Sequence, residues 1–180
     1  MIKRSLAAGV LAVMMGLSVG ASAQAPTLPA ASATIINRAG EAIGEARFTE
    51  GPRGVLVYVR IRAGGLPPGP HGTHIHSVGT CDDREQGFVA SGAHLGAPDL
   101  PHGLLNPTGD YGDLPNLFAH ADGSVEAEMF TTLISLSGTS GRGTVLDANG
   151  AAIVIHAARD DHLSQPIGNS GARIACGVIR

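Results

Sequence analysis

The sequence predicts an all-β domain built as an antiparallel sandwich or barrel, and three observations lead to this prediction. Short apolar or alternating runs recur along the chain without helical periodicity. Turn-forming residues separate these runs, and two long stretches, 64–72 and 77–115, hold much Gly, Pro, Asp and His but little periodic apolar pattern. The runs expected to be strands are 33–36, 54–61, 124–130, 151–156 and 174–179.

The N-terminal segment, residues 1–23, is typical of a secretory signal peptide. Lys3 and Arg4 precede an apolar run from Leu6 to Val19, and Ala21-Ser22-Ala23 matches the small-x-small pattern that a signal peptidase accepts. A membrane anchor is the alternative, but the run is short for a bilayer and glycines interrupt it. We therefore expect an exported chain without stable membrane insertion.

Residues 24–32 are expected to form a flexible lead-in, because this Ala- and Pro-rich segment has too little apolar content to join a core. The remaining residues, 33–180, are enough for one domain. Two tight hairpin turns are expected within it, at Asp122-Gly123 and Asn149-Gly150, since these pairs readily supply positive φ angles.

The charge of the chain argues against a general nucleic-acid-binding protein. Residues 1–23 contain two basic residues and no acidic one, so their removal takes the formal net charge from −3 to −5. Lys3 is the single lysine, so every fixed side-chain positive charge of the mature chain is an arginine. Any anionic ligand must therefore be attracted by arginines.

Two cysteines, Cys81 and Cys176, lie far apart in the sequence. In an oxidising compartment such a pair most simply forms a disulfide, which would close nearly the whole domain. Free thiols and soft metal ligands are the alternatives, although the many histidines make thiolate ligation unnecessary.

Histidines concentrate in and beside the long loop region. Six of the eight are found there: His71, His74, His76, His94, His102 and His120. On a strand, the His-x-His pair His74 and His76 would place both imidazoles on one face. A lone pair of this kind is often structural, so the pair alone is weak evidence for a metal site.

Other potential ligands accompany this pair. They are His94 and His102 on a Gly- and Pro-rich loop, the acidic Asp110 and Asp113 beyond them, and a distant His156 that ends an apolar run. Imidazoles suit copper or zinc, and a carboxylate added to imidazoles suits zinc. The composition therefore suggests two unlike metal sites.

Six sequence elements, in this order, resemble the copper/zinc superoxide dismutases of the bacterial exported kind. They are His74-Ile75-His76, Gly92-Ala93-His94, His102-Gly103, Gly112-Asp113-Leu114-Pro115-Asn116, Ile155-His156-Ala157 and the run GNSGARIACGVI from Gly168 to Ile179. The resemblance covers residues 33–180. It implies a Greek-key antiparallel β-sandwich or barrel with long metal-binding loops, one disulfide between Cys81 and Cys176, and a periplasmic location.

The resemblance also implies a role for individual residues. Copper is assigned to His74, His76, His94 and His156, and zinc to His94, His102 and Asp113, so that His94 bridges the two metals. Arg173 matches the active-site arginine. Asp160 matches a carboxylate that links ligands of the two metals through their free N–H groups, and His71 a structural histidine.

Asp110 is a departure from the family pattern. The family has a zinc-binding histidine three residues before the aspartate that corresponds to Asp113, and this chain has Asp110 there in a segment one residue shorter. Zinc accepts a carboxylate oxygen at about the same distance as an imidazole nitrogen. We therefore expect Asp110 to complete the zinc site, with its backbone held closer, and the neighbouring Tyr111 to serve packing.

The resemblance implies dismutation of superoxide to dioxygen and hydrogen peroxide by a copper that cycles between Cu(II) and Cu(I). His94 would release copper on reduction and carry a proton, and Arg173 would attract and orient the superoxide anion. The alternative is an exported protein of the same fold that buffers or delivers copper or zinc with little turnover, but this gives Arg173 no role.

Several residues keep a default interpretation. Arg84, Arg142 and Arg159 are candidates for attracting superoxide, with solubilisation as the preferred interpretation. His120 and His162 are expected to be solvated surface histidines. The sequence leaves a monomer and a homodimer both open, because periodicity does not describe an interface.

Overall fold

The structure, a computed structural model, describes residues 27–139 and 141–180. The expected signal peptide, residues 1–23, lies outside the described residues. Within them, no helix has the length and apolar character needed to cross a bilayer.

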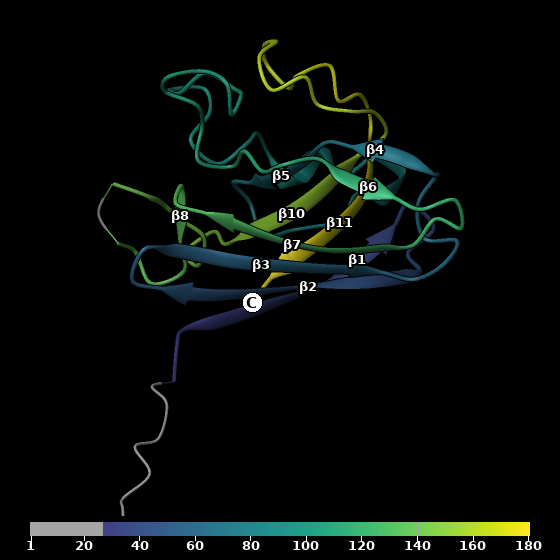
Figure 1. The fold of residues 1–180 in the computed structure, drawn as a ribbon, viewed down its shortest axis with the longest axis horizontal. Helices are drawn as coiled ribbons and strands as arrows, with labels where there is room; N and C mark the ends of the chain where they lie inside the picture. The colour runs from purple at the N-terminus through teal and green to yellow at the C-terminus, as the bar shows by residue number, and fades with distance from the viewer. Residues whose placement is uncertain (1–26, 140) are drawn as a thin grey trace, which may run out of the picture.

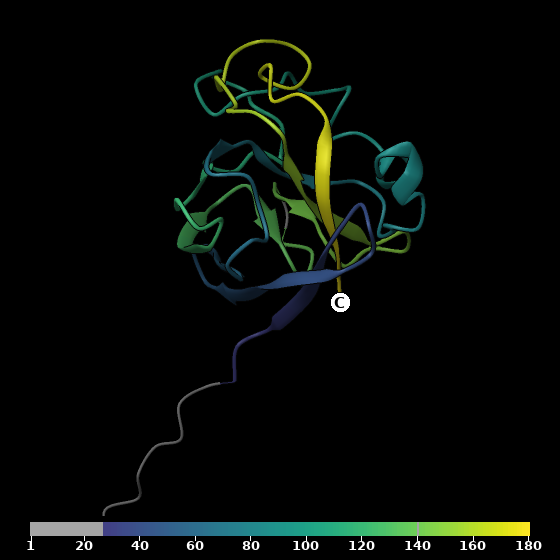
Figure 2. The same cartoon turned by 90° about the vertical axis from the view of Figure 1, so that its right-hand side faces the viewer.

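Seven strands form one curled antiparallel sheet (Figures 1 and 2). They are β1 (Ala30–Asn37), β2 (Ala42–Gly51), β3 (Gly54–Ile61), β5 (Thr73–His76), β7 (Val125–Thr131), β10 (Ala151–His156) and β11 (Arg173–Ile179). Their order in the sheet is β5-β10-β11-β1-β2-β3-β7. Strands β1, β2 and β3 are neighbours in chain order, whereas long connections carry the chain from β3 to β5 at the opposite edge and from β7 back to β10 beside β5, as expected of a Greek-key fold.

Short elements complete the fold. Strands β4 (Gly69–His71) and β6 (Leu117–Ala119) form an antiparallel pair, and β8 (Ile134–Ser135) and β9 (Gly143–Thr144) a parallel one. Two 3-10 turns, η1 (Arg84–Gln86) and η2 (Val89–Ser91), lie in the loop after β5. The all-β prediction with long loops is confirmed, and so is the disulfide, because Cys81 and Cys176 are bonded.

The core lies inside the curled sheet, and it follows from alternation along the strands. In β3, Val55, Val57, Val59 and Ile61 are buried and point to one face. They pack with Phe48 of β2, Ile35 of β1 and the apolar side chains of β5 and β10 in one cluster. Because side chains alternate with a period of two, the residues between them, Leu56, Tyr58 and Arg60, lie on the other face.

Strands β5 and β10 differ from the other strands of the seven-stranded sheet, because every residue in them is buried. Ile75, Ile153 and Ile155 join the main core, while Ala152 and Val154 join a second cluster with Phe88 and the two cysteines. Two long loops, 77–116 and 157–172, lie together at one end of the sheet (Figures 1 and 2). The core covers one face of β5 and β10, and the loops cover the other. Polar side chains on the loop-covered face are therefore enclosed as well.

Five strands of the large sheet match the predicted runs; β5 was not among these runs, and neither was β2. Its buried residues do not keep a period of two, because Ile43 and Ala46 are three positions apart. The register between β1 and β2 shifts at this point, between Ile35 and Ile36. An irregularity of this kind re-aims the side chains that follow it, and so it hides the strand pattern.

Two further expectations differ from the structure. Strand β1 begins at Ala30, inside the expected lead-in, because pairing with β2 buries Ala31 against Phe48. Turns occur at Asp122-Gly123 and Asn149-Gly150, with φ of 80° at Gly123 and 65° at Gly150. They are not hairpins, since each joins strands of different sheets.

Candidate metal centre

The His-x-His pair lies on β5, on the face opposite the main core. Ile75 between the two histidines is fully buried in that core, so alternation turns His74 and His76 toward the loops. In the register of the sheet, His74 lies opposite Val154 and His76 opposite Ala152 of β10.

The loop after β5 folds back and places further ligand types beside this pair. His94 pairs with His76, and Asp113 with His74, as isolated backbone bridges. Gly112 permits this approach, since a Cβ at that position would collide with a backbone oxygen of β5. Residues that follow β5 by 18 or more positions in the sequence are thus in direct contact with this strand.

His156 and Arg173 enter from the neighbouring strands. His156 is the last residue of β10 and Arg173 the first of β11, and the two are partners in the antiparallel register. A register irregularity between Ile155 and His156 re-aims the histidine at the strand end.

Four buried imidazoles converge, and each has one ring nitrogen without a hydrogen-bond partner among the described residues. These atoms are Nδ1 of His74 and Nε2 of His76, His94 and His156. One potential ligand atom from each histidine lies within 4.8 Å of those of the other three. Buried polar atoms are ordinarily paired, so four unpaired nitrogens around one point fit a metal ion that takes imidazole ligands.

The second nitrogen of three of these rings is fixed by a hydrogen bond. Nε2 of His74 lies 2.7 Å from Oδ2 of Asp160, Nδ1 of His76 lies 2.9 Å from the carbonyl of Gly92, and Nδ1 of His156 lies 2.9 Å from the carbonyl of Gly171. These contacts set the orientation of each ring and leave the opposite nitrogen to a metal.

A second group lies on the other side of His94. Its donor atoms are Nδ1 of His94 and His102 and carboxylate oxygens of Asp110 and Asp113. The Nδ1 of His102 and Oδ1 of Asp113 are 2.7 Å apart, yet neither atom makes a hydrogen bond, as expected of two ligands aimed at a third atom.

The spacing of these donors fits zinc. Tetrahedral zinc with bonds of about 2.0–2.1 Å holds its ligand atoms about 3.3 Å apart. Here Nδ1 of His94 lies 3.1 Å from Asp110 and 3.7 Å from Asp113, and Nδ1 of His102 lies 3.9 Å from Asp110 and 2.7 Å from Asp113. The four distances bracket the tetrahedral value.

Asp110 is fully buried at the position where the sequence departs from the family pattern. Its Oδ2 is 3.1 Å from Nδ1 of His94, and its Oδ1 accepts a hydrogen bond from the N–H of Gly112 at 3.0 Å. His74 also lies within 4.8 Å of the ligand atoms of this group, whereas Asp110 is outside that set. However, Nε2 of His74 is bonded to Asp160, and its Nδ1 is directed into the four-histidine group.

Asp160 forms hydrogen bonds to one histidine of each group. Its Oδ2 lies 2.7 Å from Nε2 of His74, and its Oδ1 lies 3.0 Å from Nε2 of His102. Burial opposes the charge of this carboxylate, but the hydrogen bonds from the two histidines outweigh it and hold the pKa of Asp160 well below its usual range. One anion therefore orients one ring of each group.

The two groups differ in their electrostatics. Burial lowers the pKa of His74 to about 4 and that of His156 to about 3, so these imidazoles are neutral, as ligands must be. Burial also opposes the charged form of His102, but the adjacent carboxylates of Asp113 and Asp160 outweigh it and raise the pKa of His102 to about 10. A metal held by the second group would take the place of that proton on His102.

A cavity of about 240 Å³ lies beside His156, one of the four histidines. His156 and Arg173 line it, together with Arg38 and residues of the segments 86–89 and 167–172. Among the described residues of its lining are two arginines and no carboxylate. The cavity is therefore suited to a small anion.

Arg173 is held in place by backbone and hydroxyl oxygens. Its guanidinium donates to the carbonyls of Phe88 and Gly92, each at 2.8 Å, and to Oγ of Ser91 at 3.1 Å. The carbonyl of Gly92 also accepts from His76. One loop, tied to β11 by the disulfide, therefore positions both the arginine and a histidine of the first group.

Comparison with known proteins identifies the family. A family profile described as copper/zinc superoxide dismutase (SODC) matches residues 42–179. The chain belongs to the copper/zinc superoxide dismutase family. A superoxide dismutase (Cu-Zn) of Caulobacter vibrioides is 48% identical over 153 residues, which cover 83% of this chain and 86% of that protein. Superoxide dismutase (Cu-Zn) 2 of Aquifex aeolicus is 39% identical over 152 residues, with 83% and 86% covered.

Solved structures of this superoxide dismutase family and its relatives share the fold. A double mutant of a SOD-like protein from Bacillus subtilis has a TM-score of 0.74 and 38% identity, covering 82% of this chain and 95% of that one. The Cu/Zn superoxide dismutase from Brucella abortus has a TM-score of 0.67 and 26% identity, covering 84% and 100%.

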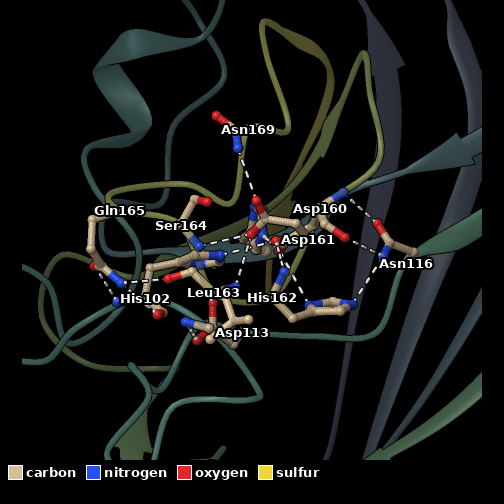
Figure 3. A network of polar contacts seen from close by, with 12 residues as sticks. His102, Asp113, Asn116, Asp160, Asp161, His162, Leu163, Ser164, Gln165 and Asn169 are labelled. Carbon is tan, nitrogen blue, oxygen red and sulfur yellow. Dashed lines mark hydrogen bonds and ion pairs between the residues drawn. The ribbon is translucent and has the colours of Figure 1, made fainter.

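Some residues at the edge of the site, to which the sequence analysis gave no role, make hydrogen bonds to Asp160 and His102. Figure 3 shows Asn116, Gln165 and His162 around Asp160 and His102. Asn116 accepts from the backbone N–H of Asp160 at 2.8 Å and donates to its carbonyl at 2.9 Å, and Gln165 makes an equivalent pair of bonds to His102. His162 was expected to be a solvated surface residue, but it is half-buried and its ring contacts Asn116.

The remaining candidates fall outside the centre. Both ring nitrogens of His71 contact backbone carbonyls, those of His156 and Pro67, so this ring does not face a metal group. His120 is exposed, as expected, and Tyr111 packs against the core.

The three arginines considered from sequence do not line the cavity. Arg84 donates to the carbonyl of Ala39, Arg142 lies 4.0 Å from Glu50 at the end of β2, and Arg159 is exposed. Arg38 does line the cavity. It was not a candidate from sequence, because the turn between β1 and β2 is distant from the histidines in sequence.

Proposed function

We propose that this chain catalyses the dismutation of superoxide to dioxygen and hydrogen peroxide, with copper in the four-histidine group and zinc in the group of His102, Asp110 and Asp113. The observation that carries the proposal is the convergence of four buried, unpaired imidazole nitrogens beside a cavity that Arg173 lines. The relatives that bear the name superoxide dismutase (Cu-Zn) support it.

Copper bound by His74, His76, His94 and His156 would supply one-electron chemistry, since nitrogen ligands support both of its common oxidation states. His94 is the shared residue, because Nε2 faces the first group and Nδ1 the second. We assign to His94 the transfer of a proton from Nε2 to the outgoing product, while Nδ1 stays with the second group.

Arg173 is the residue assigned to docking of the anion. Burial lowers the pKa of its guanidinium and the charge of Asp83 opposes this, but an arginine keeps its charge in proteins. Its oxygen partners fix the planar fork beside His156, so that a small anion is attracted and oriented at once. A protein that merely stores metal has no need of this arginine in the cavity.

Asp110 is the fourth zinc ligand in this proposal. Its buried carboxylate adds a negative charge where the family pattern has a zinc-binding histidine. The added charge strengthens attraction for the cation, and Gly112 holds the short side chain close through its N–H.

We propose that the chain acts after export, in the periplasm. The support is the signal-like composition of residues 1–23 together with a disulfide that needs an oxidising compartment. The N-terminal sequence of the secreted protein tests this, and Gln24 is the expected first residue.

Superoxide decay tests the proposed activity. We expect decay that is first order in enzyme and proportional to bound copper when the protein carries both metals. A preparation with one copper and one zinc per chain and no decay above background would contradict the proposal, and would favour the metal buffering or delivery protein.

A further inference from the structure

His102 lies in a segment without regular secondary structure, so no strand ladder fixes its backbone. A buried backbone N–H or C=O needs a partner. Gln165, which is 63 residues away in sequence, partners both groups: its Oε1 accepts from the N–H of His102, and its Nε2 donates to the carbonyl of His102, each at 2.8 Å (Figure 3). The carbonyl also accepts from the side chain of Asn106, so Gln165 is the side chain that holds both backbone groups of His102.

The ring of His102 is fixed from the same loop. Oδ1 of Asp160 binds its Nε2 at 3.0 Å, which leaves Nδ1 directed toward Asp113. Gly168 makes room for this contact, because a Cβ there would collide with Asp160. Two residues of the loop 157–172 therefore hold one histidine, one at its backbone and one at its ring.

We propose that Gln165 is a positioning residue for the zinc group: by clamping the backbone of His102 it sets where Nδ1 meets the metal. The inference rests on the proposed function only in taking the second group to bind zinc. Partners of metal ligands typically change metal affinity by 10–100-fold when removed.

The loop does not need this clamp to keep its own shape. Asp161 accepts hydrogen bonds from the N–H groups of Leu163 and Ser164 and from the side chain of Asn169, at 2.8–2.9 Å. Apart from a bond to the carbonyl of Leu163, the side-chain hydrogen bonds of Gln165 go to His102. A role in the metal group is therefore separable from a role in loop stability.

Gln165→Ala and Gln165→Met in the full chain test the inference, methionine keeping the length of the side chain without its amide. The control is Asn169→Gly, which removes a bond within the same loop; glycine is chosen because Asn169 has a φ of 58°. Zinc affinity is measured by competition with a chromogenic chelator, copper affinity in parallel, and melting temperature with and without zinc.

We expect both Gln165 variants to bind zinc about tenfold more weakly and copper within about twofold of the unaltered protein. The metal-free melting temperature should stay the same while the rise caused by zinc shrinks, and Asn169→Gly should bind zinc normally. Unchanged zinc affinity in both variants, or an equal loss in Asn169→Gly, would overturn the inference.

The two proposals fail differently. A protein that binds zinc and removes superoxide, with Gln165 variants that behave identically, would overturn only the role of Gln165. An unaltered chain that binds no zinc would overturn both this role and the zinc half of the proposed function.

Discussion

The bond between Cys81 and Cys176 should make one of the largest single contributions to stability, and replacing both cysteines by serine tests this. The bond joins residues 95 positions apart. In the chain-entropy account, a loop of that length destabilises the unfolded state by about 4.7 kcal/mol. For a domain of this size, each kcal/mol corresponds to about 2–4 °C, so the melting temperature should fall by about 10–20 °C.

A second consequence follows from what the bond holds. The segment 81–92 supplies the carbonyls of Phe88 and Gly92 to Arg173, and the bond ties this segment to β11. Loss of the bond should therefore also release the guanidinium. We expect the double variant to lose activity even when its copper content is unchanged.

Thermal unfolding of metal-free protein is the assay, because bound metal adds its own stabilisation. The unaltered protein, the double variant and the unaltered protein after reduction, with two free thiols verified by titration, are compared. A melting temperature that moves by less than about 2 °C would show that the bond contributes little to stability.

Substitutions at three positions test the site. Arg173→Glu should keep copper and lose at least about tenfold in superoxide removal, with Arg173→Lys milder; loss of copper in parallel would make Arg173 structural. Asp110→Ala should lose zinc in a metal analysis and keep copper, and unchanged zinc affinity would show that Asp110 is not a ligand. Arg38→Glu should slow superoxide removal about 2–10-fold at low ionic strength, with the effect shrinking as salt rises. Arg60→Glu is the control, because it makes the same charge change away from the cavity. An equal loss of rate in Arg60→Glu would show that the effect of Arg38→Glu comes from net charge and not from the cavity.

The strands that could be predicted are those whose burial alternates or is continuous. β3 and β10 could be predicted because the apolar pattern of their sequences agrees with their burial in the fold. β2 could not be predicted, since its register shift breaks the alternation and charged residues occupy its exposed face. The burial of Ala31 depends on pairing with β2, which composition does not report.

The metal centre could be predicted only in part from residue types. His-x-His spacing on a strand places two imidazoles together, but the meeting of His94, His102 and His156 with them depends on loop paths that have no local signal. The resemblance to a family supplied these partners. The resemblance did not identify Gln165. Nothing in the sequence distinguishes this exposed loop amide from others, because its contact with His102 spans 63 residues.

Anomalous scattering from crystals of the copper- and zinc-loaded protein, measured at both metal absorption edges, locates and identifies each metal. We expect one copper among His74, His76, His94 and His156, and one zinc among His94, His102, Asp110 and Asp113, with His94 in contact with both. The same metal at both positions, or a zinc without contact to His94, would contradict this assignment.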